Sequence, residues 1–482
     1  MPGNAEGRAL RIAFALGSFD DSASNAEMTA LYFDWARLAA RQGHEVLLLT
    51  LSDQGDSVEV REGVQIVRKH FNAHRFAGLE KLGIVPVTTW FLTRSAELFR
   101  LSIEVFAAFR PDMLQFVKAT DSLFFSSQGL CPVVIQSVSP QFAMMQLNLD
   151  GQYSRLDTSL VNTLEVAGYG LADAITTPSL TLASMISEGT GVPLDSMSII
   201  KSPVDIVAAD LAKPEPLSHE PFPKIFHSAG VERLKGVEFL VDALPAIHQT
   251  FPDFHLTIAG EEPILIGEES PYSQVLKERL KDMGLDGHVQ FLGVQPRARI
   301  HELIERSDIF AFPLLYCGCP YGSQEAMVRG TPVLATRAGA IPEFVEHGKT
   351  GWLVEPGNAS AIAEAIVKLS NDPDLRAKLS IRARQSMREM CSPETLAGQM
   401  SAVYDGVLRR FQSRNDEDRG WKVRTVELLL GSLAELSDGP ALANLLDAKY
   451  KEGLQAGQQA TPNRSTIASR TKAMLARAMK NR

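Results

Sequence analysis

The chain has few cysteines: Cys131, Cys317, Cys319 and Cys391 are the four among 482 residues. So few cannot form the disulfide framework that holds small secreted domains together, and this favours a reducing compartment. Cys317 and Cys319 have C-x-C spacing, but no second Cys or His pair with ligand spacing accompanies them. We therefore expect no metal site.

Long apolar runs and an excess of positive charge are also missing. No stretch reaches the roughly 18 apolar residues of a membrane-spanning helix, and the first residues, "MPGNAEGRALRIAFALG", lack the apolar core of a signal peptide. The net charge of −9 gives no overall attraction to nucleic acid. These absences predict a cytoplasmic protein that does not bind nucleic acid.

Short apolar runs alternate with longer helical patterns along the chain. The runs are "LRIAFALG", "VLLLT", "VQIVRK", "DMLQFV", "PVVIQSV", "AITTPS" and "SIIKS", then "KIFHSAG", "HLTIAG", "HVQFLG", "DIFAFP", "TPVLATRAG" and "GWLVEP". They are continuous rather than alternating, as in parallel strands covered on both faces. The strand–helix alternation predicts α/β architecture with doubly wound sheets.

The prolines and charges of residues 209–223 interrupt this pattern and predict a linker. We expect one domain over 1–208, a second over 224–412, and a charged, helical extension over 413–482. The last helix of the second domain, about 392–412, has Ser392 as its predicted N-cap. We expect this helix to pack back on the first domain.

Ligands of such proteins lie beyond the carboxyl ends of the strands. Lys235 follows "KIFHSAG" at a turn into a helix, where a cation and backbone N–H groups can hold a phosphate; a solvated turn lysine is the alternative. Gly293 and Val294 follow "HVQFLG", where a glycine lets a flat ligand approach the backbone, although a plain turn fits too.

Glu325 is the only acid between Ala311 and Gly339. We expect a short helix to open at residues 323–325 and to place this carboxylate in its first turn. There it either favours the helix dipole or accepts hydrogen bonds from two vicinal hydroxyls, as on a ribose.

These segments together resemble glycosyltransferase family 4, the glycogen-synthase-like group with the GT-B fold. The motifs are "AGVERLKGVEFLVDAL", "LTIAGEEP", "HVQFLGVQP" and "SDIFAFPLL…QEAMVRGTPVLATRAGAIPEFVEHGKTGWLVEPGN", with fainter similarity in "LYFDWARLAARQGHEVLLLT", "LADAITTPS" and "IIKSPVDI". The likeness covers residues of about 8–412.

The resemblance implies two Rossmann-like domains facing a cleft, with a nucleoside-diphosphate sugar on the C-terminal domain and a hydroxyl acceptor mainly on the N-terminal domain. It implies sugar transfer without metal or other cofactor, usually with retention of anomeric configuration. Lys235 falls on the family's diphosphate-binding lysine, and Glu325 on the second Glu of its Glu-x7-Glu signature, which holds the ribose. We expect further donor contacts from Gly318, Gly322 and Ser323.

Four cleft positions depart from the family. Cys317 stands at the first Glu of the signature, or Cys319 in an alternative register, and a thiol cannot replace a charged acceptor of sugar hydroxyls. Gly230 replaces an arginine, for which Arg233 is a candidate substitute. Ser24 and Asn25 replace a Gly-Gly pair in the donor loop, and Ser139 replaces a histidine.

These departures leave three functions open: a transferase with an unusual donor or acceptor, a catalytically silent GT-B protein that binds a partner transferase or a glycan, and an epimerase or phosphorylase. The last stretch, "RSTIASRTKAMLARAMKNR", has six basic and no acidic residues. It could contact a membrane surface or a protein partner. The sequence does not identify the nucleobase, the sugar, the acceptor or the oligomeric state.

Overall fold

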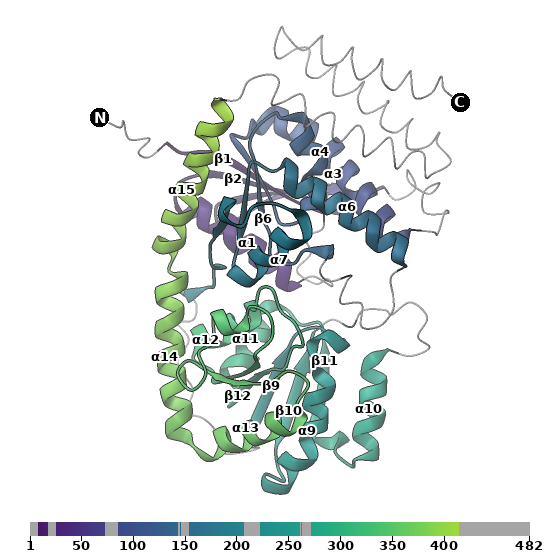
Figure 1. The fold of residues 1–482 in the computed structure, drawn as a ribbon, viewed down its shortest axis with the longest axis vertical. Coiled ribbons are helices and arrows are strands. Elements are labelled where there is room, and N and C mark those ends of the chain that lie inside the picture. Colours follow the sequence, from purple (N-terminus) through teal and green to yellow (C-terminus); the bar gives the residue numbers. More distant parts are fainter. Residues whose placement is uncertain are drawn as a thin grey trace.

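A computed structural model describes residues 8–17, 26–72, 85–142, 145, 154–206, 222–260, 262 and 271–413. Its strands form two sheets, one built from residues 11–199 and the other from residues 224–354. The two α/β units lie end to end, and the long helices at the end of the described chain run alongside both (Figure 1). The predicted linker lies largely outside the described residues, as does the predicted extension beyond residue 413.

The N-terminal sheet has eight strands in the order β3-β4-β2-β1-β5-β6-β7-β8. The strands are β1 (Arg11–Leu16), β2 (Glu45–Ser52), β3 (Ser57–Arg61), β4 (Val64–His70), β5 (Met113–Phe116), β6 (Val133–Gln136), β7 (Ala174–Thr177) and β8 (Met197–Ile199). The helices are α1 (Ala26–Arg41), α3 (Pro86–Phe109), α4 (Ala119–Gln128), α6 (Arg155–Leu171) and α7 (Leu180–Thr190), with a 3-10 turn η2 (Leu194–Ser196).

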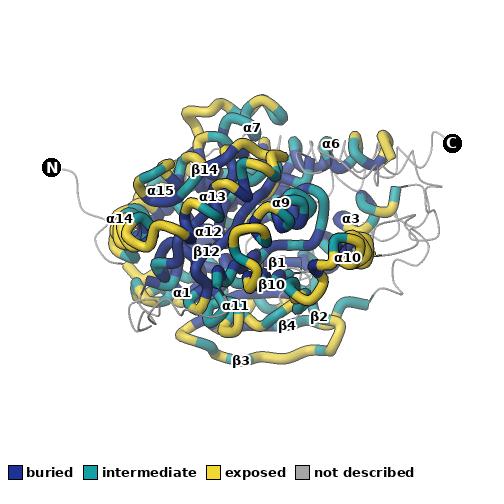
Figure 2. The backbone as a smooth tube through the Cα atoms, turned by 90° about the horizontal axis from the view of Figure 1, so that it is seen from below, coloured by how far each residue is buried: buried dark blue, intermediate teal, exposed yellow. Residues whose placement is uncertain are grey.

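All neighbours in this sheet pair in parallel except β3, which pairs antiparallel with β4. The apolar runs predicted the parallel strands, and this antiparallel edge strand was not among the predicted ones. Both faces of β3 are largely exposed, with Val58 and Val60 among the exposed apolar side chains (Figure 2). A strand without a buried face has no continuous apolar run, so the pattern that revealed the other strands did not reveal this one.

The C-terminal sheet has six parallel strands in the order β11-β10-β9-β12-β13-β14. They are β9 (Lys224–Ser228), β10 (His255–Ala259), β11 (Val289–Gly293), β12 (Ile309–Phe312), β13 (Val333–Thr336) and β14 (Trp352–Val354). The helices are α9 (Val237–Thr250), α10 (Tyr272–Asp282), α11 (Arg297–Glu305), α12 (Tyr321–Arg329), α13 (Ala359–Asn371), α14 (Pro373–Cys391) and α15 (Pro393–Gln412), with 3-10 turns η3 (Arg233–Lys235), η4 (Asp286–His288) and η5 (Ile341–Glu343).

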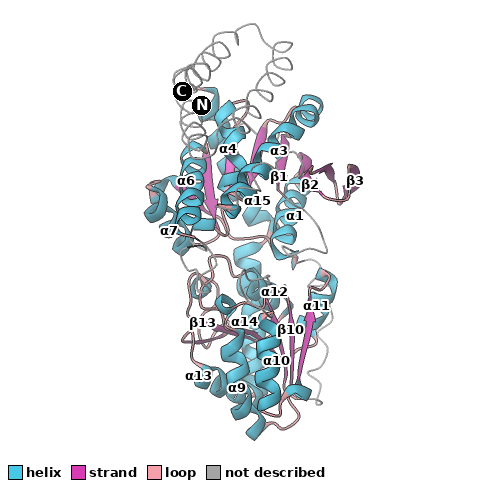
Figure 3. Ribbon diagram, turned by 90° about the vertical axis from the view of Figure 1, so that its right-hand side faces the viewer, coloured by secondary structure: helices cyan, strands magenta, loops and turns pink. Residues whose placement is uncertain are grey.

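Each sheet is covered by helices on both faces (Figure 3). Successive residues of β1 point to opposite sides, so Phe14 packs in the cluster that contains α1, whereas Ala15 packs with α3. In the second sheet, Ile225 of β9 packs with α9 and α13, whereas Phe226 packs with α12. This confirms the doubly wound α/β architecture.

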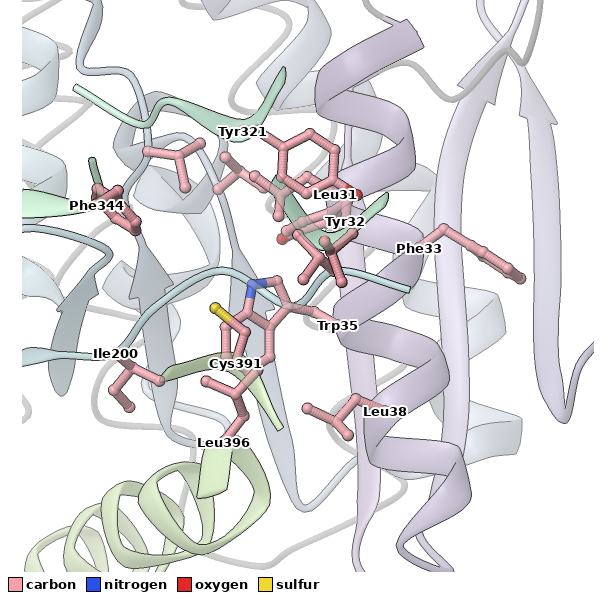
Figure 4. Close-up of a cluster of buried hydrophobic side chains, with 14 of the residues drawn as sticks. Leu31, Tyr32, Phe33, Trp35, Leu38, Ile200, Tyr321, Phe344, Cys391 and Leu396 are labelled. Carbon is pink, nitrogen blue, oxygen red and sulfur yellow. The ribbon is translucent and has the colours of Figure 1, made fainter. Parts of the chain in front are cut away.

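One hydrophobic cluster is continuous between the two units. It joins Leu31 and Trp35 of α1 to Tyr321 of α12 and to Leu396 of α15 (Figure 4). Ser392 caps α15 as predicted, because its Oγ accepts a hydrogen bond from Thr395 N at 3.1 Å. Further along α15, the Tyr404 hydroxyl donates to Gln115 Oε1 of β5 at 2.7 Å. Apolar packing and a buried hydrogen bond therefore hold α15 against the N-terminal sheet.

Candidate active site

Lys235 lies where the sequence places it, at the turn between β9 and α9. Gly236 follows it with φ +65°, and a Cβ there would lie 2.1 Å from the Pro313 carbonyl oxygen. Only glycine fits such a close approach, so the β9–α9 turn is pressed against the end of β12. The Lys235 ammonium lies 3.4 Å from Glu232 Oε1, and its side chain is about one-quarter exposed. The lysine is thus held at a helix N-terminus but is still reached by solvent.

Arg233 lies on the same turn but faces a different part of the domain. Its guanidinium lies 5.2 Å from the centre of the Tyr272 ring and 3.8 Å from Glu238 Oε2. These contacts direct it toward α9 and α10, and the side chain is 43% exposed. Gly230 stands where the family has an arginine, and the suggestion that Arg233 takes over the role of that arginine stays a prediction.

Glu325 lies in the second turn of α12, because that helix begins at Tyr321, two residues earlier than expected. The helix dipole acts mainly within the first turn, so it contributes little to this carboxylate. Two side chains of α11 hold Glu325 Oε1 instead: Arg297 Nε donates to it at 3.1 Å, and His301 Nε2 lies 2.8 Å away. Among the described residues, none donates a hydrogen bond to Oε2.

Glu325 is only 5% exposed. Burial by itself raises the pKa of a carboxyl group, but the Arg297 charge and the His301 hydrogen bond outweigh it and lower the pKa of Glu325 to about 2. The residue is therefore ionised at every pH at which the protein would work. Its Oε2 shares a permanent negative charge and has no hydrogen-bond donor among the described residues.

The partners of Glu325 on α11 did not emerge from the sequence. Arg297 Nη2 also donates to Asp34 Oδ2 of α1 at 2.7 Å, and the Tyr321 hydroxyl donates to the same oxygen at 2.6 Å. Arg297 and His301 are four residues apart, on one face of the helix that follows β11, and Asp34 interrupts the apolar run "LYFDWA". An acid within a buried helical stripe was the one available signal.

The loop after β12 contains the two cysteines and packs against other backbone segments. The carbonyl oxygen of Cys317 accepts from Ala340 N at 2.7 Å, and a Cβ on Gly339 would lie 2.2 Å from that oxygen. Gly318 presents its carbonyl oxygen to Ser179 Oγ of the N-terminal unit at 3.0 Å. Cys319 Sγ lies 3.3 Å from Ser202 Oγ. The loop therefore touches both units, and neither cysteine is accompanied by a carboxylate in these contacts.

Gly322 and Ser323 are packed inside the domain. A Cβ on Gly322 would lie 3.3 Å from the Phe312 ring and 3.4 Å from the Ser228 carbonyl oxygen, so this glycine lets α12 approach the sheet closely. Ser323 is fully buried, and its hydroxyl donates to the Pro320 carbonyl at 2.8 Å. These contacts support the helix, and a donor contact by Gly322 or Ser323 stays a prediction.

The remaining predicted donor residues follow β11, an edge strand of the C-terminal sheet, or lie outside the described chain. Gly293 ends β11 with φ +64° and has open space around its Cβ direction, and Val294 beyond it is 39% exposed. A flat ligand could approach the backbone here, since none of the described residues beyond its two chain neighbours lies within 4 Å of a Cβ built on Gly293. Ser24 and Asn25 lie outside the described residues.

A second charged contact joins the units at η5. Glu343 Oε2 accepts from Leu180 N and its Oε1 from Thr181 N, both at 2.8 Å, so a carboxylate of the C-terminal unit caps α7 of the N-terminal unit. Lys201 Nζ lies 3.6 Å from Glu343 Oε2. Because these residues follow β7 and β13, the carboxyl ends of the two sheets face a common interface.

In the described part of the chain, no group of three or more His, Cys, Asp or Glu side chains could hold a metal ion. No helix among the described residues has the length and apolar character needed to cross a membrane.

Two doubly wound units whose strand ends meet at one interface define the GT-B fold. A sucrose-phosphate synthase from Thermosynechococcus elongatus superposes with a TM-score of 0.64 over 83% of this chain and 100% of that chain, at 18% identity. The Anabaena protein HepE, solved in complex with UDP and glucose, superposes with a TM-score of 0.62 over 82% and 100%, at 20% identity. The likeness establishes the fold.

Residues 210–386 match the family model described as "Glycosyl transferases group 1". The chain is 30% identical over 187 residues to N-acetyl-alpha-D-glucosaminyl L-malate synthase of Bacillus anthracis, a match that covers 38% of this chain and 46% of that enzyme. It is 24% identical over 385 residues to glycogen synthase of Mycobacterium tuberculosis, covering 76% and 87%. The chain spans less than half the length of the first curated relatives it matches.

Proposed function

We propose that this chain is a glycosyltransferase that moves a sugar from a nucleoside-diphosphate sugar to a hydroxyl acceptor with retention of configuration. The observation that carries the proposal is the pair formed by Lys235 at the β9–α9 turn and Glu325 in α12, within a segment that matches the group 1 model. The solved relative with UDP and glucose supports a nucleotide sugar as donor. By the resemblance, we further propose family 4, a hexosyl donor and a cytoplasmic location.

The proposed chemistry needs positioning and charge stabilisation. The bond between sugar C1 and the diphosphate oxygen breaks, and its electron pair leaves with the diphosphate. The acceptor hydroxyl oxygen bonds to C1, and its proton passes to the departing diphosphate oxygen on the same face. Lys235 would stabilise the charge that grows on the diphosphate. Glu325 Oε2 would accept one hydrogen bond from the ribose, since Oε1 already serves Arg297 and His301.

Thermal unfolding with a panel of UDP-, GDP-, ADP- and dTDP-sugars tests the donor site. A ligand at 100 times its dissociation constant stabilises the folded state by about 2.7 kcal/mol. We expect one nucleotide class to raise the melting temperature of the wild type and of the control Glu302→Gln, which removes a partly exposed charge on α11. Glu325→Ala should lose the shift.

A panel without any shift would refute the donor site and favour a silent binding protein, to which Cys317 at the signature position already points. In a turnover assay with the identified donor, Lys235→Met should lower the rate by about 100-fold or more, since it removes a charge at the developing anion. Unchanged turnover in this variant would remove Lys235 from the mechanism.

A further inference from the structure

Asp34 of α1 joins the two units through one of its oxygens, Oδ2, while Oδ1 is held within its own helix. It is 1% exposed, and its Oδ1 accepts from Arg37 Nη2 at 2.7 Å. Its Oδ2 accepts from Arg297 Nη2 at 2.7 Å and from the Tyr321 hydroxyl at 2.6 Å, both of the C-terminal unit. Figure 4 shows Tyr321 beside Leu31 and Tyr32 of α1, within the apolar cluster that the units share.

Arg297 connects this contact to the proposed donor carboxylate. One guanidinium reaches Glu325 Oε1 through Nε at 3.1 Å and Asp34 Oδ2 through Nη2 at 2.7 Å. The guanidinium is planar and its donors have fixed directions, so a rotation that improves one contact moves the other. A lysine has a single ammonium on a flexible stem and cannot hold two carboxylates in this fixed relation.

The arrangement is shielded from solvent at its centre. Glu325 and Asp34 are both almost fully buried, and Arg297 is 29% exposed at its side chain. Burial makes charge interactions strong, and an unpaired charge in such a place is costly. Arg297 and the Tyr321 hydroxyl therefore both tie α1 to the C-terminal unit through Asp34.

We propose that Arg297 is a positioning residue that couples nucleotide binding at Glu325 to the seating of the N-terminal unit through Asp34. The inference rests on the proposed function and adds a role for a residue outside the donor motifs. A ribose on Glu325 Oε2 fixes the carboxylate, the carboxylate orients Arg297, and Arg297 holds α1. By linkage, loss of the Asp34 contact must weaken nucleotide binding as much as nucleotide binding strengthens the contact.

The test is a double-mutant cycle on nucleotide affinity, measured by calorimetry on the full chain with the nucleotide that the thermal panel identifies. Asp34→Asn should weaken binding by about fivefold or more, the lower end of typical coupling between sites. Arg297→Lys should weaken it at least as much. The double variant should lose less affinity than the sum of the two single losses, because Asp34 and Arg297 act through the contact that they share. Glu302→Gln on α11 is the matched control and should bind as the wild type does.

Amide hydrogen exchange gives a second readout that a purely structural role would not move. Saturating nucleotide should slow exchange in residues 29–41 of the wild type and of Glu302→Gln, and should do so much less in Arg297→Lys. This variant keeps the positive charge, so it carries the test if Asp34→Asn does not fold.

Three results would overturn the coupling: unchanged affinity in Asp34→Asn, additive losses in the double variant, or equal nucleotide-dependent protection of α1 in Arg297→Lys. These results leave the donor site intact if Glu325→Ala still abolishes binding. A wild type that binds no nucleotide overturns the proposed function first, and the coupling with it.

Discussion

Glu165 of the N-terminal unit and Glu325 of the C-terminal unit are the same residue type at nearly the same burial, 2% and 5% exposed. Glu165 accepts hydrogen bonds from Gln141 N at 2.8 Å and Phe142 N at 2.5 Å, the segment that follows β6. Burial dominates there and raises the pKa of Glu165 to about 7, against the two amides and the more distant Lys118 charge. At Glu325, the Arg297 and His301 side chains of α11 outweigh burial, so the pKa is lowered instead of raised.

The difference teaches that burial alone does not decide whether a carboxyl group is charged. Two backbone amides supply only partial charges and do not replace the water that an ionised carboxylate loses. A guanidinium group with a full positive charge, in direct contact with the carboxylate, does compensate for the lost water. The N-terminal unit thus keeps a carboxyl group that titrates near neutrality, and the C-terminal unit keeps one that is always ionised.

The largest expected effect is the difference in protein stability between substitution of Glu325 and substitution of Glu165. Glu325→Gln removes the charge that balances Arg297 and should lower the free energy of unfolding at pH 7 by about 3 kcal/mol, as expected for a broken buried pair. Glu165→Gln removes a group that is already half protonated there and should cost about 1 kcal/mol or less. Urea unfolding of both variants measures the difference. Equal losses would mean that Arg297 does not stabilise Glu325 in the folded protein.

The second effect is the pH dependence of the unfolding free energy that arises from Glu165. Between the ordinary pKa of a glutamate and the folded pKa of about 7, the folded state holds a proton that the unfolded chain has lost. Stability from this group is therefore full at low pH and falls as pH rises through 7, by about 2 kcal/mol between pH 5.5 and pH 8. The difference in unfolding free energy between wild type and Glu165→Gln should follow this fall. A difference that stays constant over this range would contradict the raised pKa.

Apolar runs predicted the thirteen parallel strands of the described residues because most of them are buried between helices, and Phe14 or Phe310 has no polar neighbour that would break such a run. The turn at Lys235 was likewise predictable, since a strand, a glycine and a helix follow one another locally. The ion pair between Arg297 and Asp34 was not, because 263 residues separate its members and only the packing of the two units brings them together. Local sequence patterns predict burial and turns. They do not predict which distant charged residue pairs with a buried one.

The third effect sharpens the comparison with a carboxylate that resembles Glu165 in its partners. Glu343 also accepts from two backbone amides, but it is partly exposed and lies near Lys201. Burial raises the pKa of Glu343 less than the hydrogen bonds from Thr181 and Leu180 lower it, so its pKa lies below the usual range. Its contribution is therefore present at neutral pH and is lost as pH falls below the ordinary value. Glu343→Gln should cost about 1 kcal/mol at pH 7, a typical cap, and much less at acid pH. A cost that grows on acidification would contradict this assignment.

The smallest effect concerns Lys118, whose ammonium lies over the rings of Trp90 and Phe91 at 5.4 Å from each centre. Its charge lowers the pKa of Glu165, but it ranks behind burial and the two amide hydrogen bonds. Lys118→Met removes that charge and keeps most of the apolar stem. The midpoint of the Glu165-dependent fall in stability should move to higher pH, which denaturation curves of Lys118→Met and its double variant with Glu165→Gln would show. A midpoint that moves to lower pH would mean that another positive group, brought closer by the substitution, controls Glu165. An unmoved midpoint would show that the rings and solvent screen the ammonium completely, and that the amides alone oppose the effect of burial.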